Sequence, residues 1–283
     1  MSARAGRIVL EARGLSKSYG GIRALRSIDL SLAEGETLGL IGPNGAGKTT
    51  LFNLLSGAER ADEGSIRIGG REVTRSSPEA RARLGLARTF QAGRCFSGLS
   101  VRDNLLVGAH VDRLAARSGS RFGALGALVE LAQALFPLAA FRAEEEGLRL
   151  RAASLASRFG ERLSPRLGDP AYSLSYANRR RLELARALAG RPRILLLDEP
   201  TAGMNPAETE ELLGFLSSLK AEGLSMIVIE HKLPLVIGLS DRVIAMDEGE
   251  ALAEGAPEEV ARDPRVVEAY LGSGRIGARG GGQ

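Results

Sequence analysis

The alternation of hydrophobic and polar positions near the start of the chain predicts two half-buried strands. Apolar side chains occupy every second position over 8–12 and again over 28–32. A period of two is typical of a strand with one face in the core and one face in solvent. Gly20 and Gly21 lie between the two segments, so a turn there would bring the chain back as an antiparallel β layer.

Further along, short and continuously apolar segments predict an α/β core. Thr37–Ile41 is one such strand, and a glycine-rich loop and the helical segment Lys48–Ser56 follow it, with Gly57 able to end the helix. The segments 194–197 and 226–229 are apolar throughout, as expected for parallel strands that helices cover on both faces.

The remaining segments complete the expected organisation of one domain, residues 1–283. The core with its β layer takes 7–91 and 192–255, while 92–191 has helical composition and no convincing strand, which predicts an inserted α-helical subdomain. We expect one helix over 256–271, then a flexible Gly/Arg tail over 272–283, which has too few apolar groups to fold alone. No internal repeat is found, which excludes a solenoid.

Composition limits the class of protein. The 283 residues, 25% of them charged and 44% hydrophobic, are enough for a large core. The single cysteine, Cys95, excludes an intramolecular disulfide and a four-thiolate zinc site. We expect no secretory signal, because the first 13 residues contain no long apolar region. The segment 123–141 is the most apolar, but Glu, Gln and Pro interrupt it, which favours a buried or partner-facing helix over a membrane span.

The net charge of +4 raises the alternative of a nucleic-acid partner. Of the 38 basic residues, however, only four are lysine, and an arginine surplus can reflect codon bias. The charge is also divided by region, since 194–262 holds 14 acidic residues and 4 basic ones. The charge alone therefore does not predict binding of nucleic acid.

The most specific motif is a phosphate-binding loop. Residues 42–49 match the pattern G-x-x-x-x-G-K-[ST] between a strand and a helix, which is the context that such a loop requires. Its glycines let backbone amides surround an anion, and the helix adds its positive end. Lys48 would reach the β and γ phosphates, and the Thr49 hydroxyl suits Mg²⁺. The residues expected to contact the nucleotide here are Gly42, Pro43, Asn44, Gly45, Ala46, Gly47, Lys48, Thr49 and Thr50.

An acidic pair after the strand 194–197 supplies the expected chemistry. Asp198 would bind in the Mg²⁺ shell, and Glu199 beside it would polarise the attacking water as a general base. A solvated cap at a strand end is the alternative, which the preceding apolar residues and Pro200 disfavour.

Together these motifs resemble the ATP-binding cassette family, the ATPase subunits of ABC transporters, over nearly the whole chain. The resemblance implies a P-loop NTPase fold that binds and hydrolyses ATP with Mg²⁺. It also implies that Tyr19 stacks on adenine, and that Gln91 in Ala-Arg-Thr-Phe-Gln is a Mg²⁺ ligand that senses the membrane partner. His231, directly after the strand 226–230, is similar to the family's switch histidine, which contacts the γ-phosphate.

Residues 174–178, Leu-Ser-Tyr-Ala-Asn, resemble the family's signature motif, usually Leu-Ser-Gly-Gly-Gln. The resemblance implies that Ser175, Tyr176 and Ala177 meet the phosphates of ATP held by a second cassette. Ala177 departs from the pattern, which has glycine at this position. The alanine β-carbon would crowd the γ-phosphate, and it would add backbone strain if the position requires a positive φ. A cassette that binds ATP but hydrolyses it slowly is therefore an alternative.

Several phrases are similar to the ATP-binding subunits of branched-chain amino acid importers. They are Ala-Arg-Thr-Phe-Gln at 87–91, Asn-Leu-Leu-Val at 104–107, Leu-Glu-Leu-Ala-Arg at 182–186, Ala-Gly-Met-Asn-Pro at 202–206, Ile-Glu-His-Lys at 229–232 and Ala-Tyr-Leu-Gly at 269–272. The resemblance implies a dimer with the same chain or a homologous cassette, transmembrane permease subunits and, indirectly, a periplasmic solute-binding protein. It implies a peripheral position on the cytoplasmic face of the bacterial inner membrane.

Two other functions stay open. Importers of urea, amides or other solutes use closely similar subunits, and a soluble ABC-type ATPase that acts on nucleic acid or ribosomes is supported only by the arginine surplus. Such soluble relatives usually carry two cassettes or a long coiled-coil insertion, and the sequence contains neither. We therefore expect no nucleic-acid partner.

Overall fold

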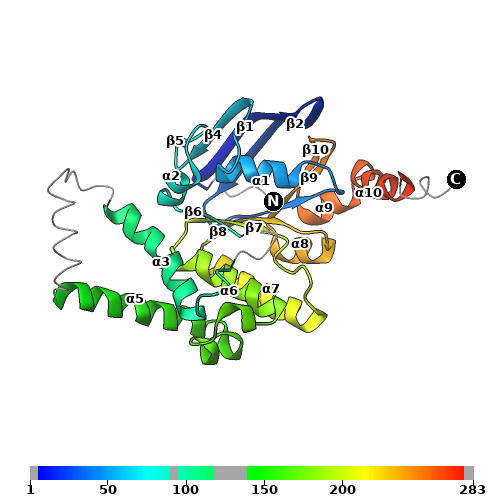
Figure 1. Cartoon of the computed structure of the whole chain (residues 1–283). Helices are drawn as coiled ribbons and strands as arrows, with labels where there is room; N and C mark the ends of the chain where they lie inside the picture. Colours follow the sequence, from blue (N-terminus) through cyan, green and yellow to red (C-terminus); the bar gives the residue numbers. More distant parts are fainter. Residues whose placement is uncertain (1–5, 90–94, 118–138, 277–283) are drawn as a thin grey trace. The chain divides into compact units, whose positions relative to one another are not determined.

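The computed structural model describes residues 6–89, 95–117 and 139–276 (Figure 1). Contacts within the chain define two compact units. One consists of residues 1–91 and 193–283, and the other of residues 92–192.

The first unit begins with a four-stranded antiparallel sheet in the order β2-β1-β4-β5. β1 (Ile8–Tyr19) pairs with β2 (Ile22–Ala33) down to the last couple, Tyr19 with Ile22, so that Gly20 and Gly21 form the turn. The predicted β hairpin is confirmed. Its partners β4 (Glu63–Ile68) and β5 (Arg71–Glu72) come after the first helix and were not predicted.

A six-stranded sheet in the order β10-β9-β3-β8-β7-β6 forms the second layer. The predicted strands are confirmed as its centre, β3 (Thr37–Ile41), β8 (Ser225–Ile229) and β7 (Ile194–Asp198), which are parallel and buried along their whole length. The outer strands are β6 (Leu86–Arg88), β9 (Arg242–Asp247) and β10 (Glu250–Gly255), of which only β10 is antiparallel.

Helix α1 (Lys48–Ser56) follows β3 after the loop 42–47, as predicted, and lies between the two sheets (Figure 1). Leu51, Phe52 and Leu55 are fully buried in one hydrophobic core with side chains of both sheets. Gly57 ends the helix in the left-handed conformation, φ 80°, because a residue without a β-carbon adopts it at little cost. These buried side chains hold α1 in place, and with it the point where the phosphate loop meets the helix.

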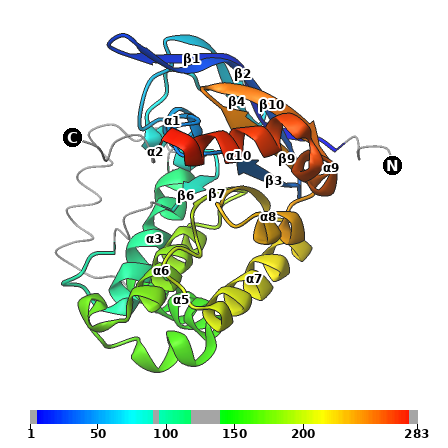
Figure 2. The same cartoon turned by 90° about the vertical axis from the view of Figure 1, so that its right-hand side faces the viewer.

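The other helices of this unit follow the strands. They are α2 (Pro78–Arg83), α7 (Pro206–Ala221), α8 (Leu233–Leu239), α9 (Pro257–Arg262) and α10 (Pro264–Ile276), the last two shown in Figure 2. The prediction of one helix over 256–271 is wrong. Asp263 is extended, with ψ 124°, because the ring of Pro264 disfavours helical backbone in the residue before it. The predicted start of the tail is also wrong, since α10 continues to Ile276, and 277–283 lies outside the described residues.

In the described part of the second unit, helices and short turns connect through irregular segments, and the only β pairing there is an isolated bridge between Ser100 and Pro170. Its helices are α3 (Val101–Arg117), α5 (Ala139–Ser157) and α6 (Tyr176–Ala189), with the short 3₁₀ turns η1 (Gly160–Arg162), η2 (Ser164–Arg166) and η3 (Ala171–Ser173). α3 packs closely on α6 at Gly108. A β-carbon on Gly108 would lie only 2.1 Å from the carbonyl oxygen of Arg186, so the two helices could not approach this closely with a larger residue there. Most of the apolar segment 123–141 lies outside the described residues. None of the described helices combines the length and the hydropathy that crossing a membrane requires.

Candidate functional site

The loop between β3 and α1 has a conformation that only glycine allows at two points. Gly42 has φ 148°, and a β-carbon there would lie 2.1 Å from the carbonyl oxygen of Met246. Gly47 has φ 96°, and a β-carbon there would lie 2.6 Å from the carbonyl oxygen of Ala24. Strands β9 and β2 therefore enclose both ends of the loop, while the exposed Gly45 between them has open space around it.

The start of α1 leaves backbone donors available for an anion. In the described chain no side chain caps this end of the helix, and its first turn contains no acidic residue. The first N–H groups of a helix have no carbonyl partner within the helix, and they lie at its positive end. Asn44 and Thr49 are exposed here and Thr50 is half-buried, whereas Pro43 and Ala46 are buried. This arrangement can bind phosphate through the backbone.

Lys48 brings a buried ammonium group to the same loop. Its Nζ donates hydrogen bonds to the carbonyl oxygens of Gly42, at 2.6 Å, and of Pro43, at 2.8 Å. Burial lowers the pKa of Lys48, and the negative charges of Glu199 and Asp198 oppose that shift. Lys48 and the acidic pair therefore interact, and the ammonium can exchange two carbonyl oxygens for phosphate oxygens.

Asp198 is the last residue of β7 and is fully buried. Its Oδ2 accepts a hydrogen bond from Arg88 Nη2 at 3.1 Å, and its N–H donates to Thr89 Oγ1 at 3.3 Å. Arg88 Nη1 also donates to Asn53 Oδ1 on α1 at 2.7 Å. Arg88 was not among the predicted site residues, although an arginine among apolar residues in a strand is a signal of a buried ion pair.

Glu199 and His231, both predicted as catalytic residues, lie together. His231 Nε2 is 2.8 Å from Glu199 Oε1, and the Glu199 N–H donates to the carbonyl oxygen of Ile229 at 3.0 Å. Glu199 has a left-handed backbone with φ 48°, which is uncommon for a residue other than glycine. The main chain thus holds the two residues at the adjacent ends of β7 and β8.

A second link joins the same two segments. The buried carboxylate of Glu230 accepts hydrogen bonds from Thr201 N–H, at 2.9 Å, and from Thr201 Oγ1, at 2.7 Å. Glu230 was not among the predicted site residues. A charged residue directly after an apolar strand and beside a candidate catalytic histidine is the signal that could have found it.

Tyr19 ends β1, and its hydroxyl donates to the Glu59 carboxylate. Burial raises the pKa of Tyr19, the bond to Glu59 raises it further, and a bond with Thr50 opposes them. The residue is 44% exposed, and Lys17 Nζ lies 5.6 Å from the ring centroid. Tyr19 therefore presents an aromatic ring beside α1, as a stacking platform for a base requires.

The signature-like residues belong to the helical unit. Ser175 is exposed and caps α6, where its side chain accepts from Asn178 N–H at 3.3 Å. The Tyr176 hydroxyl accepts from Arg180 Nη2 at 3.0 Å. Ala177 is buried in the first helical turn and does not have a positive φ. The backbone strain expected for alanine at this position is therefore absent from this conformation.

The oxygen donors present fit a magnesium ion. Among the described residues there is no group of three or more His, Cys, Asp or Glu side chains that could hold a metal by itself. Mg²⁺ suits such a site, because it usually takes one or two protein oxygens together with phosphate oxygens and water. Thr49 and Asp198 are the described candidates, and Gln91, the third predicted ligand, lies outside the described residues.

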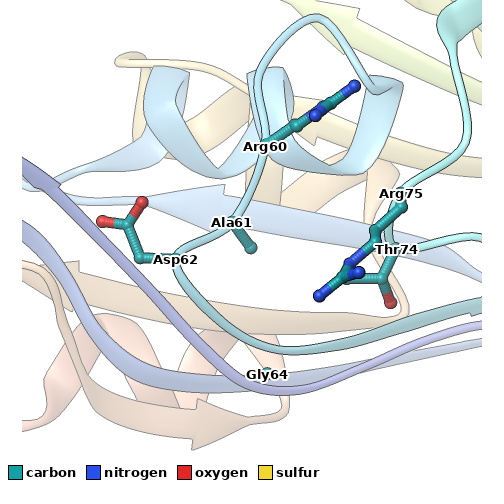
Figure 3. A pocket seen from close by; sticks show the side chains of 6 residues that line it. All are labelled: Arg60, Ala61, Asp62, Gly64, Thr74 and Arg75. Carbon is teal, nitrogen blue, oxygen red and sulfur yellow. The ribbon is translucent and has the colours of Figure 1, made fainter.

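A cavity of about 310 Å³ lies elsewhere in the first unit (Figure 3). The residues that line it are Arg60, Ala61, Asp62, Gly64, Thr74 and Arg75. The Asp62 carboxylate points away from Arg75 and instead accepts from Lys17 Nζ at 2.9 Å. The charged groups do not converge on this cavity, and it shares no residue with the site described above.

Comparison with known families and relatives agrees with this geometry. A family model described as "ABC transporter" matches residues 25–202, more than half of the chain. A second model, described as "Branched-chain amino acid ATP-binding cassette transporter", matches residues 252–275.

Two curated relatives are similar over nearly their whole length. The high-affinity branched-chain amino acid transport ATP-binding protein BraF of Pseudomonas aeruginosa is 38% identical, over 94% of this chain and 98% of its own. The corresponding protein LivG of Salmonella typhimurium is 38% identical, over 93% of this chain and 98% of its own.

A solved structure is similar in fold. The crystal structure of an ATP-binding cassette of an ABC transporter in its ADP conformation has a TM-score of 0.75 and 29% identity, with 94% of this chain and 99% of that chain covered. The predicted fold class, a P-loop NTPase core with a β layer and helical insertion, is confirmed. The chain belongs to the ABC transporter family and is one of its ATP-binding cassettes.

Proposed function

We propose that this chain is the ATP-hydrolysing subunit of an importer of branched-chain or related amino acids. The relatives that are 38% identical carry that activity in their names, and the C-terminal residues 252–275 match a model described for such cassettes. Permease subunits are the partners that this role requires, with a periplasmic solute-binding protein as an indirect one. The chain would lie peripherally on the cytoplasmic face of the inner membrane.

In this proposal the loop and Lys48 hold the phosphates of ATP. Backbone amides at the start of α1 would bind phosphate oxygens, Lys48 would reach the β and γ phosphates, and Tyr19 would stack on the base. Thr49 and Asp198, together with Gln91, would hold Mg²⁺, which neutralises charge on the phosphates when bound. The Arg88 contact keeps the Asp198 carboxylate in one orientation at the end of β7.

The observation that carries the proposed reaction is the 2.8 Å contact between Glu199 and His231. Glu199 would accept a proton from the attacking water as general base. His231 holds that carboxylate and, by turning its ring, would donate to a γ-phosphate oxygen. The charges of the acidic pair also act on Lys48, which is consistent with one site for binding and hydrolysis.

A second cassette would complete each ATP site. The exposed Ser175 hydroxyl and the start of α6 can bind a phosphate held by a partner, either the same chain or a homologue. Such an exchange makes the interface self-complementary. ATP would then hold the pair closed until hydrolysis, and this closure would drive the permease.

The variant Glu199→Gln tests the assigned base. We expect ATP turnover to fall about 100-fold or more, the scale of a lost general base, while nucleotide binding and the ATP-bound dimer persist. Glu210→Gln, an exposed change on α7, is the matched control and should leave turnover unchanged. Turnover that is unchanged in Glu199→Gln, or a variant that stays monomeric in ATP, would remove Glu199 from this role.

The transported solute needs a separate experiment. The cassette is reconstituted with its permease and binding protein in vesicles, and uptake of radiolabelled leucine is compared with uptake of urea. We expect ATP-dependent uptake of leucine. Uptake of urea alone would move the chain to the urea and amide importers and leave the ATPase assignment intact.

A further inference from the structure

The C-terminal helix α10 contacts the first residue of the phosphate loop. The hydroxyl of Tyr270 accepts a hydrogen bond from Gly42 N–H at 2.8 Å. The two residues are 228 positions apart in sequence. No role proposed above uses Tyr270.

The position of Gly42 explains why its N–H needs this acceptor. The pairing of β3 with β9 ends at Ile41 opposite Ala245, so Gly42 is the first residue beyond the parallel ladder. Gly42 is buried, and the Met246 carbonyl approaches it so closely that a β-carbon would not fit. A buried N–H without an acceptor is strongly unfavourable, and the Tyr270 hydroxyl supplies one.

Over 264–271, the part of α10 whose side chains the structure describes, one face packs on the rest of the first unit. Tyr270 is half-buried against a hydrophobic cluster that contains Val266, one helical turn earlier, and Ile41, the residue before the loop. Val267 and Leu271 are 43% and 70% exposed. The Gly42 bond is therefore part of the contact through which this face of α10 packs on the cluster.

Gly42 is bound from both sides. Its N–H donates to Tyr270, and its carbonyl oxygen accepts from Lys48 Nζ at 2.6 Å. If Lys48 turned to phosphate it would give up that carbonyl, and the Tyr270 bond would still hold Gly42 at the end of β3. A loop that keeps its bound shape loses less conformational freedom on binding.

We propose that Tyr270 is a positioning residue for the nucleotide, and that docking of α10 and binding of nucleotide stabilise each other. The coupling is reciprocal, because two events that each favour the same loop conformation must raise each other's equilibrium constant. The proposal rests on the proposed nucleotide site at Lys48.

Titration of the full chain with a fluorescent ADP analogue and Mg²⁺ tests the first half of the coupling. We expect Tyr270→Phe, which keeps the ring and removes the hydroxyl, to weaken binding about three- to tenfold, the range for one neutral hydrogen bond. For ATP hydrolysis, KM should rise while kcat stays within about twofold, a split that general loosening of the fold would not give. Tyr172→Phe, at a tyrosine 66% exposed, is the matched control.

Hydrogen exchange of the wild-type protein tests the second half and does not depend on any variant folding. Amides of α10 over 264–271 should exchange more slowly with ADP bound, and Tyr270→Phe should lose that protection. Unchanged exchange in the wild type, or unchanged affinity in folded Tyr270→Phe, overturns the proposal.

Lys48→Ala separates this result from failure of the site itself. If Lys48→Ala abolishes binding and Tyr270→Phe has no effect, only the role of Tyr270 is wrong. If Lys48→Ala also leaves the affinity unchanged, the nucleotide binds elsewhere and both proposals fail.

Discussion

Arg88 and Asp198 form a buried ion pair in which Nη2 lies 3.1 Å from Oδ2 and the side chains are 7% and 1% exposed. Arg88 also donates to Asn53 and Ser56, and it lies over the ring of Phe52 at 5.6 Å. One guanidinium thus joins α1, which begins at the phosphate loop, to the proposed metal ligand at the end of β7. The contact with Arg88 therefore orients the Asp198 carboxylate even when no metal ion is bound.

Arg88→Ala should lower the free energy of unfolding by about 3 kcal/mol or more, because Asp198 stays buried and loses a cationic partner. Urea unfolding measures the change. Arg67→Ala is the control, since the Arg67–Glu72 pair is exposed and should contribute little. Equal urea midpoints for the two variants would show that the buried pair contributes no more to the free energy of unfolding than the exposed pair does.

Ala177→Gly should make the protein less stable without making it a faster ATPase. Ala177 has helical backbone in the first turn of α6, where glycine costs about 1 kcal/mol relative to alanine. Urea unfolding and steady-state ATP turnover of the dimer are the two measurements. A clear rise in turnover would mean that the alanine β-carbon crowds the phosphate in the closed pair.

Cys95 should react slowly with thiol reagents at neutral pH. Burial raises the pKa of its thiol from 9.0 to about 11. Only the thiolate reacts, so at pH 8 the rate should be about a hundredfold below that of an ordinary thiol and should rise with pH up to about 11. Labelling with iodoacetamide at several pH values checks this, with the urea-unfolded chain as the reference. Equal rates for folded and unfolded protein at pH 8 would contradict the burial of the thiol.

The parts of the fold that the sequence predicts well are those with a strong local signal. β3, β7 and β8 are short apolar segments with helical segments after them, and the loop before Lys48 has its glycines at a diagnostic spacing. The hairpin of β1 and β2 carries both its alternation and its glycine turn. Each of these signals lies within one continuous stretch of sequence, so no contact between distant parts of the chain is needed to recognise it.

The outer strands lack such signals. β6 has three residues, and β9 begins with Arg242, whose guanidinium finds its partners in Glu36 and Glu254. These strands form because the central sheet offers them an edge, which is a tertiary effect that overrides weak local preference. The two C-terminal helices were predicted as one because apolar residues continue across Pro264.

In the site, too, the residues with a local sequence signal could be predicted and the others could not. Lys48, Glu199 and His231 could be recognised from motifs, and the structure brings the acidic residue and the histidine together. Arg88 and Tyr270 lie within family-like motifs, at 87–91 and 269–272, but no role could be predicted for them. Their hydrogen-bond partners are 110 and 228 positions away in the sequence. Such pairs become visible only when the sheet has been assembled.

The left-handed backbone of Glu199 has one more consequence, for engineering. A residue with a β-carbon costs about 1 kcal/mol in that conformation, and glycine would not. A library screened only for resistance to heat should therefore enrich Glu199→Gly, and every variant selected in this way would lack the carboxylate proposed here as the general base. At this position the residue that gives the highest thermal stability therefore differs from the residue that the proposed hydrolysis requires.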